Sequence, residues 1–234
     1  MTFRFKQFGI DDSGCSMKVG TDSVLLGAWA DLPENGRILD IGTGCGLLAL
    51  MAAQRSKASI YGIEIDEASA HQAVLNFSRS PWSNRLEAQC ISLQEFANAQ
   101  PQLFSHILTN PPYFVNSLKA PEVGRSRARH NDELPFEVLA TLSFRLLTPD
   151  GKLSLVLPVN EAALFRTVAE QAGFHPNRIL HVRPFENRPA NRILMEFGKT
   201  AGQTITEEWL SIRGEDKNYT AEYKTLTRDF YLNF

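Results

Sequence analysis

Residues 37–46 read Arg-Ile-Leu-Asp-Ile-Gly-Thr-Gly-Cys-Gly, and this stretch decides the fold class. It begins as a short apolar run typical of a buried strand and continues into glycines that alternate with other residues. Glycine permits positive φ and a close approach of the backbone to a ligand, because it has no Cβ. A helical pattern follows from Gly46 to Gln54, so the glycines occupy a turn from strand to helix. Free amides at such a helix start favour a negative group, for example a carboxylate.

The alternation of strand and helix patterns continues towards the C-terminus. Strand-like runs are expected at 58–65, 85–91, 106–109, 152–157, 177–182 and 192–197, and helices at 67–78, 135–147 and 161–172. A turn is expected at Pro149-Asp150-Gly151, before the run at 152–157. Strands that alternate with helices build βαβ units. We therefore predict an α/β fold with a seven-stranded, mostly parallel sheet and helices on both faces.

The predicted topology also indicates where a ligand binds. Ligands of such sheets lie beyond the carboxyl ends of the strands, which here are the loops after Ile41, Ile65 and Thr109. Glu64 lies at the end of the second strand, where a carboxylate can accept hydrogen bonds from both hydroxyls of a ribose. The glycine turn and Glu64 therefore predict a site for a nucleoside.

The spacing of the glycines separates two kinds of nucleotide site. A dinucleotide-binding turn has the pattern G-x-G-x-x-G, whereas residues 40–46 read D-x-G-x-G-x-G. This pattern resembles the first motif of the Rossmann-like (class I) methyltransferases, with dinucleotide binding as the alternative. The resemblance implies S-adenosylmethionine as the cofactor. Its methionine portion would lie on Gly42, Gly44 and Gly46, and its ribose on Glu64, with the adjacent Ile65 as a further candidate contact.

A second motif follows the fourth strand, where the chain reads Asn110-Pro111-Pro112-Tyr113. It resembles the catalytic motif of amino-group methyltransferases that act on adenine, cytosine or glutamine amides. The alternative is a plain proline turn after a strand. The place of the motif at a strand end, where a βαβ fold carries its site, favours the catalytic interpretation.

The motif suits the chemistry of a planar amine. The lone pair of an exocyclic amine is conjugated with its ring, so the nitrogen is a poor nucleophile. The side-chain oxygen of Asn110 and the carbonyl of Pro111 can each accept one N–H and so orient the lone pair. Pro111 and Pro112 stiffen the segment, and Tyr113 offers a face for stacking, worth about 1–3 kcal/mol. No strong base is required, because the proton becomes acidic once the nitrogen is methylated.

Two further stretches are more specific than these shared motifs. Residues 17–29 read MKVGTDSVLLGAW, and the region 213–232 contains Arg213-Gly214, Asn218-Tyr219-Thr220 and Phe230-Tyr231-Leu232. Together with Ser80-Pro81-Trp82 they resemble the bacterial tRNA1(Val) (adenine-37-N6)-methyltransferase family over nearly the whole chain. The resemblance implies a single domain over residues 1–234, with an N-terminal extension at 1–30, a Rossmann-like core at 31–198 and a tail at 199–234.

The same resemblance implies roles for individual residues. Lys18, Gly20 and Thr21 would lie near the methionine end of the cofactor, and Asp40 and Asn110 would be further cofactor contacts. One position departs from the pattern of related enzymes, which often have Asp after the third strand to contact the adenine of the cofactor. Ser92 stands there in this chain and is a candidate cofactor contact, since a serine can still hydrogen-bond, and Gln94 or Glu95 could substitute for it.

A basic stretch after the second motif is the candidate RNA contact. It contains Arg125, Arg127, Arg129 and His130, which could bind the phosphates of a tRNA anticodon arm. A solvated charged loop is the alternative. Arg178, Arg183, Arg188 and Arg192 could extend this surface, although arginines at strand edges are commonly only solvated.

Composition excludes several classes of protein. The net charge of −2 means that RNA binding would need a local basic surface. No apolar run has the length of a membrane-spanning helix, and residues 1–7, MTFRFKQ, lack the apolar core of a secretory signal. The cysteines and histidines are scattered without metal-ligand spacing. We therefore expect a cytoplasmic protein without a metal ion, and a monomer.

Three other functions fit part of the pattern. A protein methyltransferase acting on glutamine would share the Asn-Pro-Pro-Tyr motif, but such enzymes resemble a longer architecture with a helical domain before the glycine turn. A DNA adenine methyltransferase would usually carry an inserted target-recognition region, and none is visible in the sequence. A binding module without catalysis would have no need to orient an amine.

Overall fold

The structure is a computed structural model that describes residues 2–15, 17–99, 102–112 and 134–234. Five of the predicted site residues lie outside the described residues: Tyr113, Arg125, Arg127, Arg129 and His130. Their roles stay predictions.

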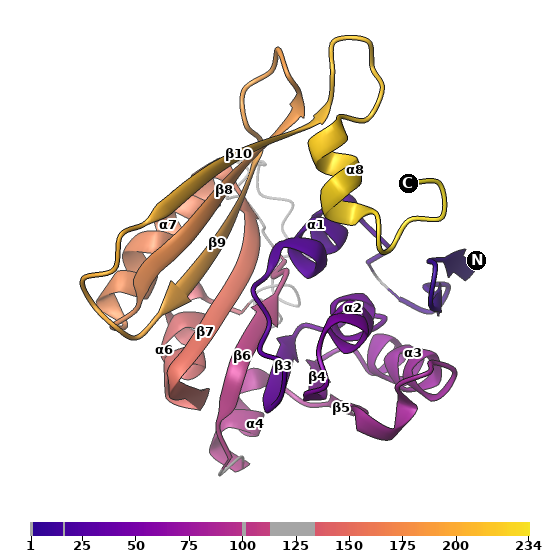
Figure 1. The fold of residues 1–234 in the computed structure, drawn as a ribbon. Helices are drawn as coiled ribbons and strands as arrows, with labels where there is room; N and C mark the ends of the chain where they lie inside the picture. The colour runs from indigo at the N-terminus through magenta and orange to yellow at the C-terminus, as the bar shows by residue number, and fades with distance from the viewer. Residues whose placement is uncertain (1, 16, 100–101, 113–133) are drawn as a thin grey trace, which may run out of the picture.

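An eight-stranded sheet forms the centre of the molecule (Figure 1). Its strand order is β10-β8-β9-β7-β6-β3-β4-β5. The strands are β3 (Arg37–Ile41), β4 (Ser59–Glu64), β5 (Leu86–Cys90), β6 (Phe104–Thr109), β7 (Leu147–Pro158), β8 (His175–Phe185), β9 (Arg192–Gly198) and β10 (Thr206–Arg213). All neighbours are parallel except β9, which is antiparallel to β7 and β8. The mostly parallel α/β fold is therefore confirmed, whereas the expected strand count of seven is wrong, because β10 adds an eighth strand.

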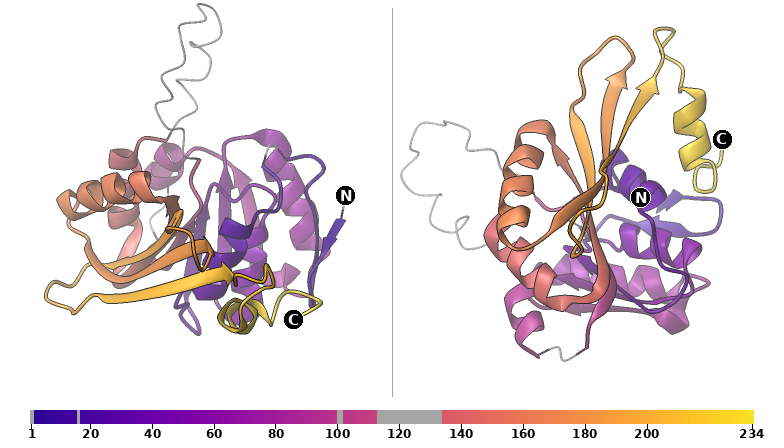
Figure 2. Two further views of the ribbon diagram at one scale, coloured as in Figure 1. Left: turned by 90° about the horizontal axis from the view of Figure 1, so that it is seen from above. Right: turned by 60° about the vertical axis from the view of Figure 1, so that its left-hand side comes forward.

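Helices cover both faces of this sheet (Figures 1 and 2). One face carries α1 (Thr21–Trp29), α2 (Leu47–Arg55), α3 (Glu67–Ser78) and α8 (Ala221–Thr227). The other face carries α4 (Leu93–Ala99), α6 (Phe136–Leu146) and α7 (Val159–Gln171). A short 3₁₀ turn, η1 (Ser83–Arg85), precedes β5. Within the described ranges, no helix is both long and apolar enough to span a bilayer.

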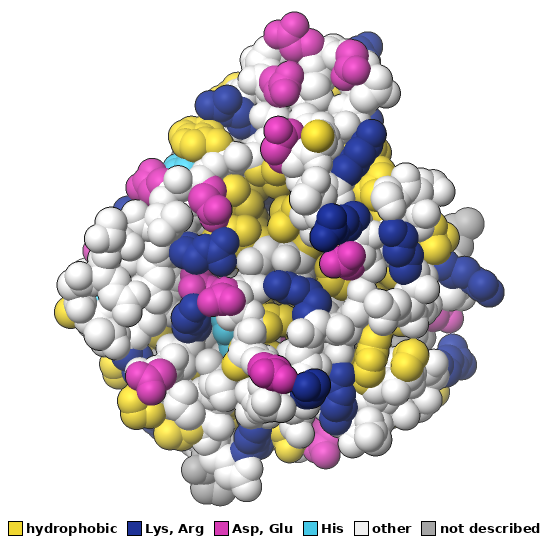
Figure 3. All heavy atoms as spheres, viewed as in Figure 1, with side chains coloured by type: hydrophobic (Ala, Val, Ile, Leu, Met, Phe, Trp, Pro, Cys, Tyr) yellow, Lys and Arg dark blue, Asp and Glu magenta, His cyan; other side chains and the backbone are white. Residues whose placement is uncertain are grey.

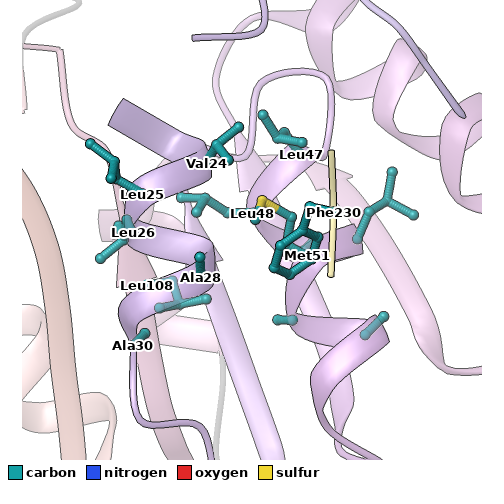
Figure 4. Close-up of a cluster of buried hydrophobic side chains, with 14 of the residues drawn as sticks. Val24, Leu25, Leu26, Ala28, Ala30, Leu47, Leu48, Met51, Leu108 and Phe230 are labelled. Atoms are coloured by element: carbon teal, nitrogen blue, oxygen red, sulfur yellow. The ribbon is translucent and has the colours of Figure 1, made fainter. Parts of the chain in front are cut away.

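The core between α1 and α2 fixes the start of the cofactor region. Val24 of α1 packs with Leu47 and Leu48 of α2, as Figure 4 shows. The helices approach closely at Gly27, where an added Cβ would lie 2.7 Å from the sulfur of Met51. Buried aliphatic side chains of this size each stabilise the fold by about 1.5–3 kcal/mol. The packing therefore holds α1 against the helix that follows the glycine turn.

Residues near both ends of the chain also pack in this core. Phe230 is buried in the same cluster, and its carbonyl accepts a hydrogen bond of 2.8 Å from the Lys6 amide. Near the N-terminus, β1 (Thr2–Arg4) and β2 (Gly9–Asp11) form an antiparallel ribbon. Tyr223 of α8 is only 2% exposed, so this aromatic side chain packs in the core as Phe230 does.

The bounds of β7 correct one local prediction. The turn expected at Pro149-Asp150-Gly151 lies inside β7, which begins at Leu147. The ladder to β6 shifts register here, because Phe104 pairs with Leu147 and His106 with Lys152. A residue in such a bulge does not have to donate a hydrogen bond to the neighbouring strand. Pro149, which has no backbone N–H, is therefore tolerated inside β7.

Candidate functional site

A cavity of about 790 Å³ opens at the carboxyl ends of β3, β4 and β6. This volume lies in the range of small-molecule sites. Residues from the four loops after β3, β4, β5 and β6 line it, together with the segment before α1. The lining includes Met17, Lys18, Val19, Ser23, Gly42, Thr43, Gly44, Cys45, Glu64, Ile65, Ser92, Gln94, Glu95, Asn110, Pro111 and Pro112.

Two glycines of the turn after β3 leave open space in front of the backbone. Gly42 has φ 71° and Gly44 has φ 55°, which favours glycine at both positions. A Cβ added at either position would meet no atom within 4 Å. The amides of Gly42 and Thr43 bind the Ile63 carbonyl at 2.9 and 3.0 Å, so the turn is tied to β4. The turn is therefore a fixed cradle whose open side belongs to the cavity.

Gly46 has a different role from the other two glycines. It is the N-cap of α2 with φ 89°, and it does not line the cavity. A Cβ at Gly46 would collide with the ring of Phe77 on α3. This glycine therefore permits close packing of α2 and α3 instead of a ligand approach.

The Glu64 carboxylate lies in the cavity and is held by backbone amides. Its Oε2 accepts a hydrogen bond from Gly44 N at 2.9 Å. Its Oε1 accepts from Ile65 N at 2.9 Å and from Asp66 N at 3.0 Å. A carboxylate offers about four acceptor sites, so one stays available for a ligand hydroxyl. Contact with both hydroxyls of a ribose would require that a hydroxyl replace one of the three backbone donors.

Asp40 lies beneath the turn and does not line the cavity. Its Oδ2 accepts hydrogen bonds from Thr43 Oγ1 at 2.7 Å and from Ala49 N at 3.2 Å, while Oδ1 has no partner in the described chain. Complete burial raises the pKa of this carboxyl to about 7, because desolvation disfavours the charged form. Asp40 therefore links the glycine turn to the first turn of α2, and the structure does not place it as a direct ligand contact.

Asn110 follows β6 and faces Ser23 of α1. Its Nδ2 donates a hydrogen bond of 2.9 Å to Ser23 Oγ. Its Oδ1 is buried and has no hydrogen-bond partner among the described atoms. The neighbouring Thr109 hydroxyl donates to the Ile41 carbonyl at 2.9 Å, which ties the ends of β6 and β3 together. A buried acceptor without a partner costs free energy, so Asn110 is prepared for a donor from a ligand.

The segment before α1 contributes only part of what the sequence predicted. Lys18 lines the cavity, and its Nζ donates to the Asp12 carbonyl at 2.6 Å and to the Ser13 carbonyl at 3.5 Å. Gly20 is the N-cap of α1 and Thr21 its first residue, and neither lines the cavity. Ser23 also lines the cavity and was not among the predicted site residues, although it lies in the stretch 17–29 quoted above.

Ser92 and Glu95 form a reciprocal hydrogen-bonded pair where α4 begins. The Ser92 hydroxyl donates to Glu95 Oε2 at 2.6 Å, and Glu95 N donates back to Ser92 Oγ at 3.2 Å. This arrangement is a capping box. The hydrogen bonds from Ser92 hold the pKa of the Glu95 carboxyl below its usual value. At the position where related enzymes often have Asp, this cavity therefore has a negative group supplied by Glu95.

Two other kinds of chemistry find no support in this cavity. Burial raises the pKa of the Cys45 thiol to about 12, so the thiol is neutral and a weak nucleophile near pH 7. Residues 2–15, 17–99, 102–112 and 134–234 contain no group of three His, Cys, Asp or Glu side chains placed to hold a metal ion. The lining instead offers a glycine cradle, the carboxylates of Glu64 and Glu95, and the buried Oδ1 of Asn110, which has no partner among the described atoms.

Comparisons with known proteins find similar methyltransferases. The family model described as methyltransferase small domain matches residues 15–163. A relative from Bacteroides fragilis is 44% identical, and the match covers 98% of this chain and 97% of the relative. A relative from Photobacterium profundum is 42% identical, with 98% of each chain covered. Both relatives carry the name tRNA1(Val) (adenine(37)-N6)-methyltransferase.

A solved structure supports the fold alone. The chain superposes on a predicted O-methyltransferase from Agrobacterium tumefaciens with a TM-score of 0.72 and 20% sequence identity. The superposition covers 89% of this chain and 96% of the other.

Proposed function

The chain belongs to the tRNA1(Val) (adenine(37)-N6)-methyltransferase family, and we propose that it methylates the N6 amine of adenosine 37 in the anticodon loop of tRNA1(Val). S-adenosylmethionine is the methyl donor. The observation that carries the proposal is the buried Oδ1 of Asn110, which has no partner among the described atoms and lies in the same cavity as the glycine cradle.

The cavity fits the cofactor on features of its own residues. The open space in front of Gly42 and Gly44 accommodates a ligand that approaches the backbone closely. Glu64 offers an acceptor for a ribose hydroxyl, and Glu95 offers one for the amino group of an adenine. When bound, S-adenosylmethionine supplies an electrophilic methyl group on a sulfonium. The Lys18 and Met17 side chains border the same space and would contact the methionine end.

Asn110 and Pro111 would orient the acceptor amine. Asn110 Oδ1 accepts one N–H of the adenine, and the Pro111 carbonyl accepts the other. With both N–H groups held, the nitrogen lone pair points to the methyl group, which is positioning rather than acid–base catalysis. The new N–C bond forms as the C–S bond breaks, and the amine proton leaves to solvent once the nitrogen is methylated. Stacking of the adenine on Tyr113 stays a prediction.

The partner class follows from the proposed reaction. The substrate is the anticodon arm of a tRNA, and the adenine has to leave the base stack to reach the cavity. We place the reaction in the cytoplasm, where tRNA is modified. The monomeric state stays an expectation.

A direct assay tests the proposal. The purified enzyme is incubated with methyl-labelled S-adenosylmethionine and, separately, with a tRNA1(Val) transcript, the same transcript with A37 replaced by guanosine, bulk DNA and a release-factor protein. We expect label as N6-methyladenosine in the first transcript alone. Label in the guanosine transcript would contradict the assigned position, and label only in protein glutamine would contradict the RNA substrate.

A further inference from the structure

An exposed aromatic stack lies on the edge of the sheet, away from the cavity. Trp209 of the edge strand β10 is 56% exposed. The rings of Trp209 and His181 are stacked at 4.3 Å with 15° between their planes. The guanidinium carbon of Arg183 lies 4.4 Å from the Trp209 ring centroid. We name Trp209, His181 and Arg183 the edge platform.

The alternation of β8 and β10 places the edge platform on one face of the sheet. Leu210 and its neighbours Leu180 and Val182 point into the core on the side of α1. Trp209, His181 and Arg183 occupy the alternate positions and so point to the opposite face. Trp209 and His181 are direct partners in the β10–β8 ladder. His181 of β8 therefore stacks on the indole of the edge strand, and more than half of Trp209 stays exposed.

The strand registers put the edge platform level with the acceptor motif. Trp209 pairs with His181, His181 with Ile193, and Ile193 with Leu157. Leu155 pairs with Thr109, so Leu157 is level with the residue two positions later, Pro111. Four strand spacings separate β10 from β6, which is about 19 Å at roughly 4.8 Å each. A stacked strand of RNA covers this span with about five to six nucleotides at roughly 3.4 Å each.

We propose that the edge platform is a second tRNA contact, at which one unpaired base stacks on the outer face of Trp209. This inference rests on the proposed function and adds a docking surface to it. Unpaired RNA bases stack on aromatic side chains and on arginine planes, and the edge platform presents both. A tRNA that places its adenine at Asn110 can reach the edge platform with an unpaired base about five or six nucleotides away.

The carboxylates near Trp209 favour the binding of one stacked base over the binding of a long stretch of RNA phosphate backbone. Glu207 contacts His181 at 3.5 Å, and the loops beyond β8 and β10 carry Glu186, Glu215 and Asp216. Figure 3 shows acidic side chains at the tip formed by these loops, with histidine, hydrophobic and basic side chains together on the edge below it. A continuous phosphate track along this edge would meet these carboxylates. A single base on the indole avoids them and leaves Arg183 for the adjoining phosphate.

Two substitutions separate stacking from charge. Trp209→Ala should raise the Kd and KM for the tRNA by about 5- to 150-fold, with kcat at saturating tRNA unchanged. Trp209→Phe keeps a ring and should restore most of the affinity. Because stacking releases no counterions, Trp209→Ala should keep the dependence of log Kd on log salt unchanged. Arg183→Gln should reduce that slope by about 0.7–0.9.

A matched control variant and an assay of S-adenosylmethionine binding show whether a loss of tRNA affinity is specific to the edge platform. Leu232→Ala removes another exposed apolar side chain, 58% exposed, and should leave tRNA binding unchanged. S-adenosylmethionine affinity should be the same in all four variants. If the parent enzyme methylates tRNA and Trp209→Ala binds tRNA with the parent's affinity, the proposed tRNA contact at the edge platform is wrong. A parent enzyme that modifies no tRNA would instead refute the proposed function.

Discussion

Asn110 donates its side-chain N–H to the Ser23 hydroxyl at 2.9 Å, and this contact turns the Asn110 oxygen away from Ser23. The oxygen is then a buried acceptor without a partner in the described chain. Asn110 comes from the end of β6 and Ser23 from the first turn of α1, so the acceptor geometry depends on two elements far apart in sequence.

Replacement of Asn110 by Ala should abolish methyl transfer and preserve cofactor binding. The variant loses the acceptor that orients the amine, so kcat should fall by at least about 100-fold. Isothermal titration with S-adenosylmethionine should give a Kd within about threefold of the parent. Turnover within a few-fold of the parent would refute the role assigned to Asn110.

Replacement of Ser23 by Ala should have a smaller effect of the same kind. It removes a hydrogen bond worth about 1 kcal/mol, so kcat should fall about fivefold as the Asn110 amide loses its preferred orientation. The KM for tRNA and the Kd for the cofactor should not change. Ser23→Thr keeps the hydroxyl and is the matched control. An equal loss in both variants would point to a steric cause instead.

The glycines of the turn should respond differently to Ala. Gly42→Ala and Gly46→Ala both strain a backbone of positive φ, at about 1–2 kcal/mol each. At Gly42 the new Cβ meets no protein atom but would occupy part of the cavity proposed for the cofactor. Cofactor affinity should therefore fall at least about tenfold, with a moderate loss of stability. At Gly46 it collides with Phe77, so stability should fall further. Addition of Phe77→Leu should recover part of that stability, as measured by thermal unfolding. Equal melting temperatures of the two single variants would contradict these separate roles.

Asp40 should make stability depend on pH. Burial raises its pKa in the folded protein to about 7, above the value of 3.8 expected without the fold. Between these values the folded state keeps a proton that the unfolded chain has lost, so stability falls as pH rises from about 4 to 7. The slope for one proton is at most about 1.4 kcal/mol per pH unit. Urea unfolding at about pH 5 and about pH 8 should show a smaller difference for Asp40→Asn than for the parent, and equal differences would exclude the effect.

The basic stretch outside the described residues has its own test. Combined replacement of Arg125, Arg127 and Arg129 by Ala should weaken tRNA binding and flatten its salt dependence. The cofactor Kd should stay constant, as measured by titration. An unchanged salt slope would mean that the stretch is only solvated.

Much of the fold followed from local patterns. The strand at 37–41 and the helix at 67–78 have the predicted bounds, since a buried apolar run and a long periodic segment dominate their neighbourhoods. The strand β10 was missed because its sequence TEEWLSIR is largely polar, and its stability comes from pairing with β8. The turn at Pro149 was wrong because a bulge against β6 accommodates turn residues inside a strand.

The site was less predictable than the fold. Pattern spacing placed Gly42, Glu64 and Asn110 at one edge of the sheet, and they do line one cavity. No pattern could separate Gly42 from Gly46, because the difference arises from the ring of Phe77 packed against one of them. The contact between Ser92 and Glu95, by contrast, follows the S-x-x-E pattern of a capping box at residues 92–95, a signal that the sequence did offer.

The burial of Phe230 against α2 has a consequence for synthesis of the protein. The helix that carries Ser23 packs in a core that residues near the other end of the sequence complete. On the ribosome, the part of this core that Phe230 covers therefore stays uncovered until almost the entire polypeptide has emerged.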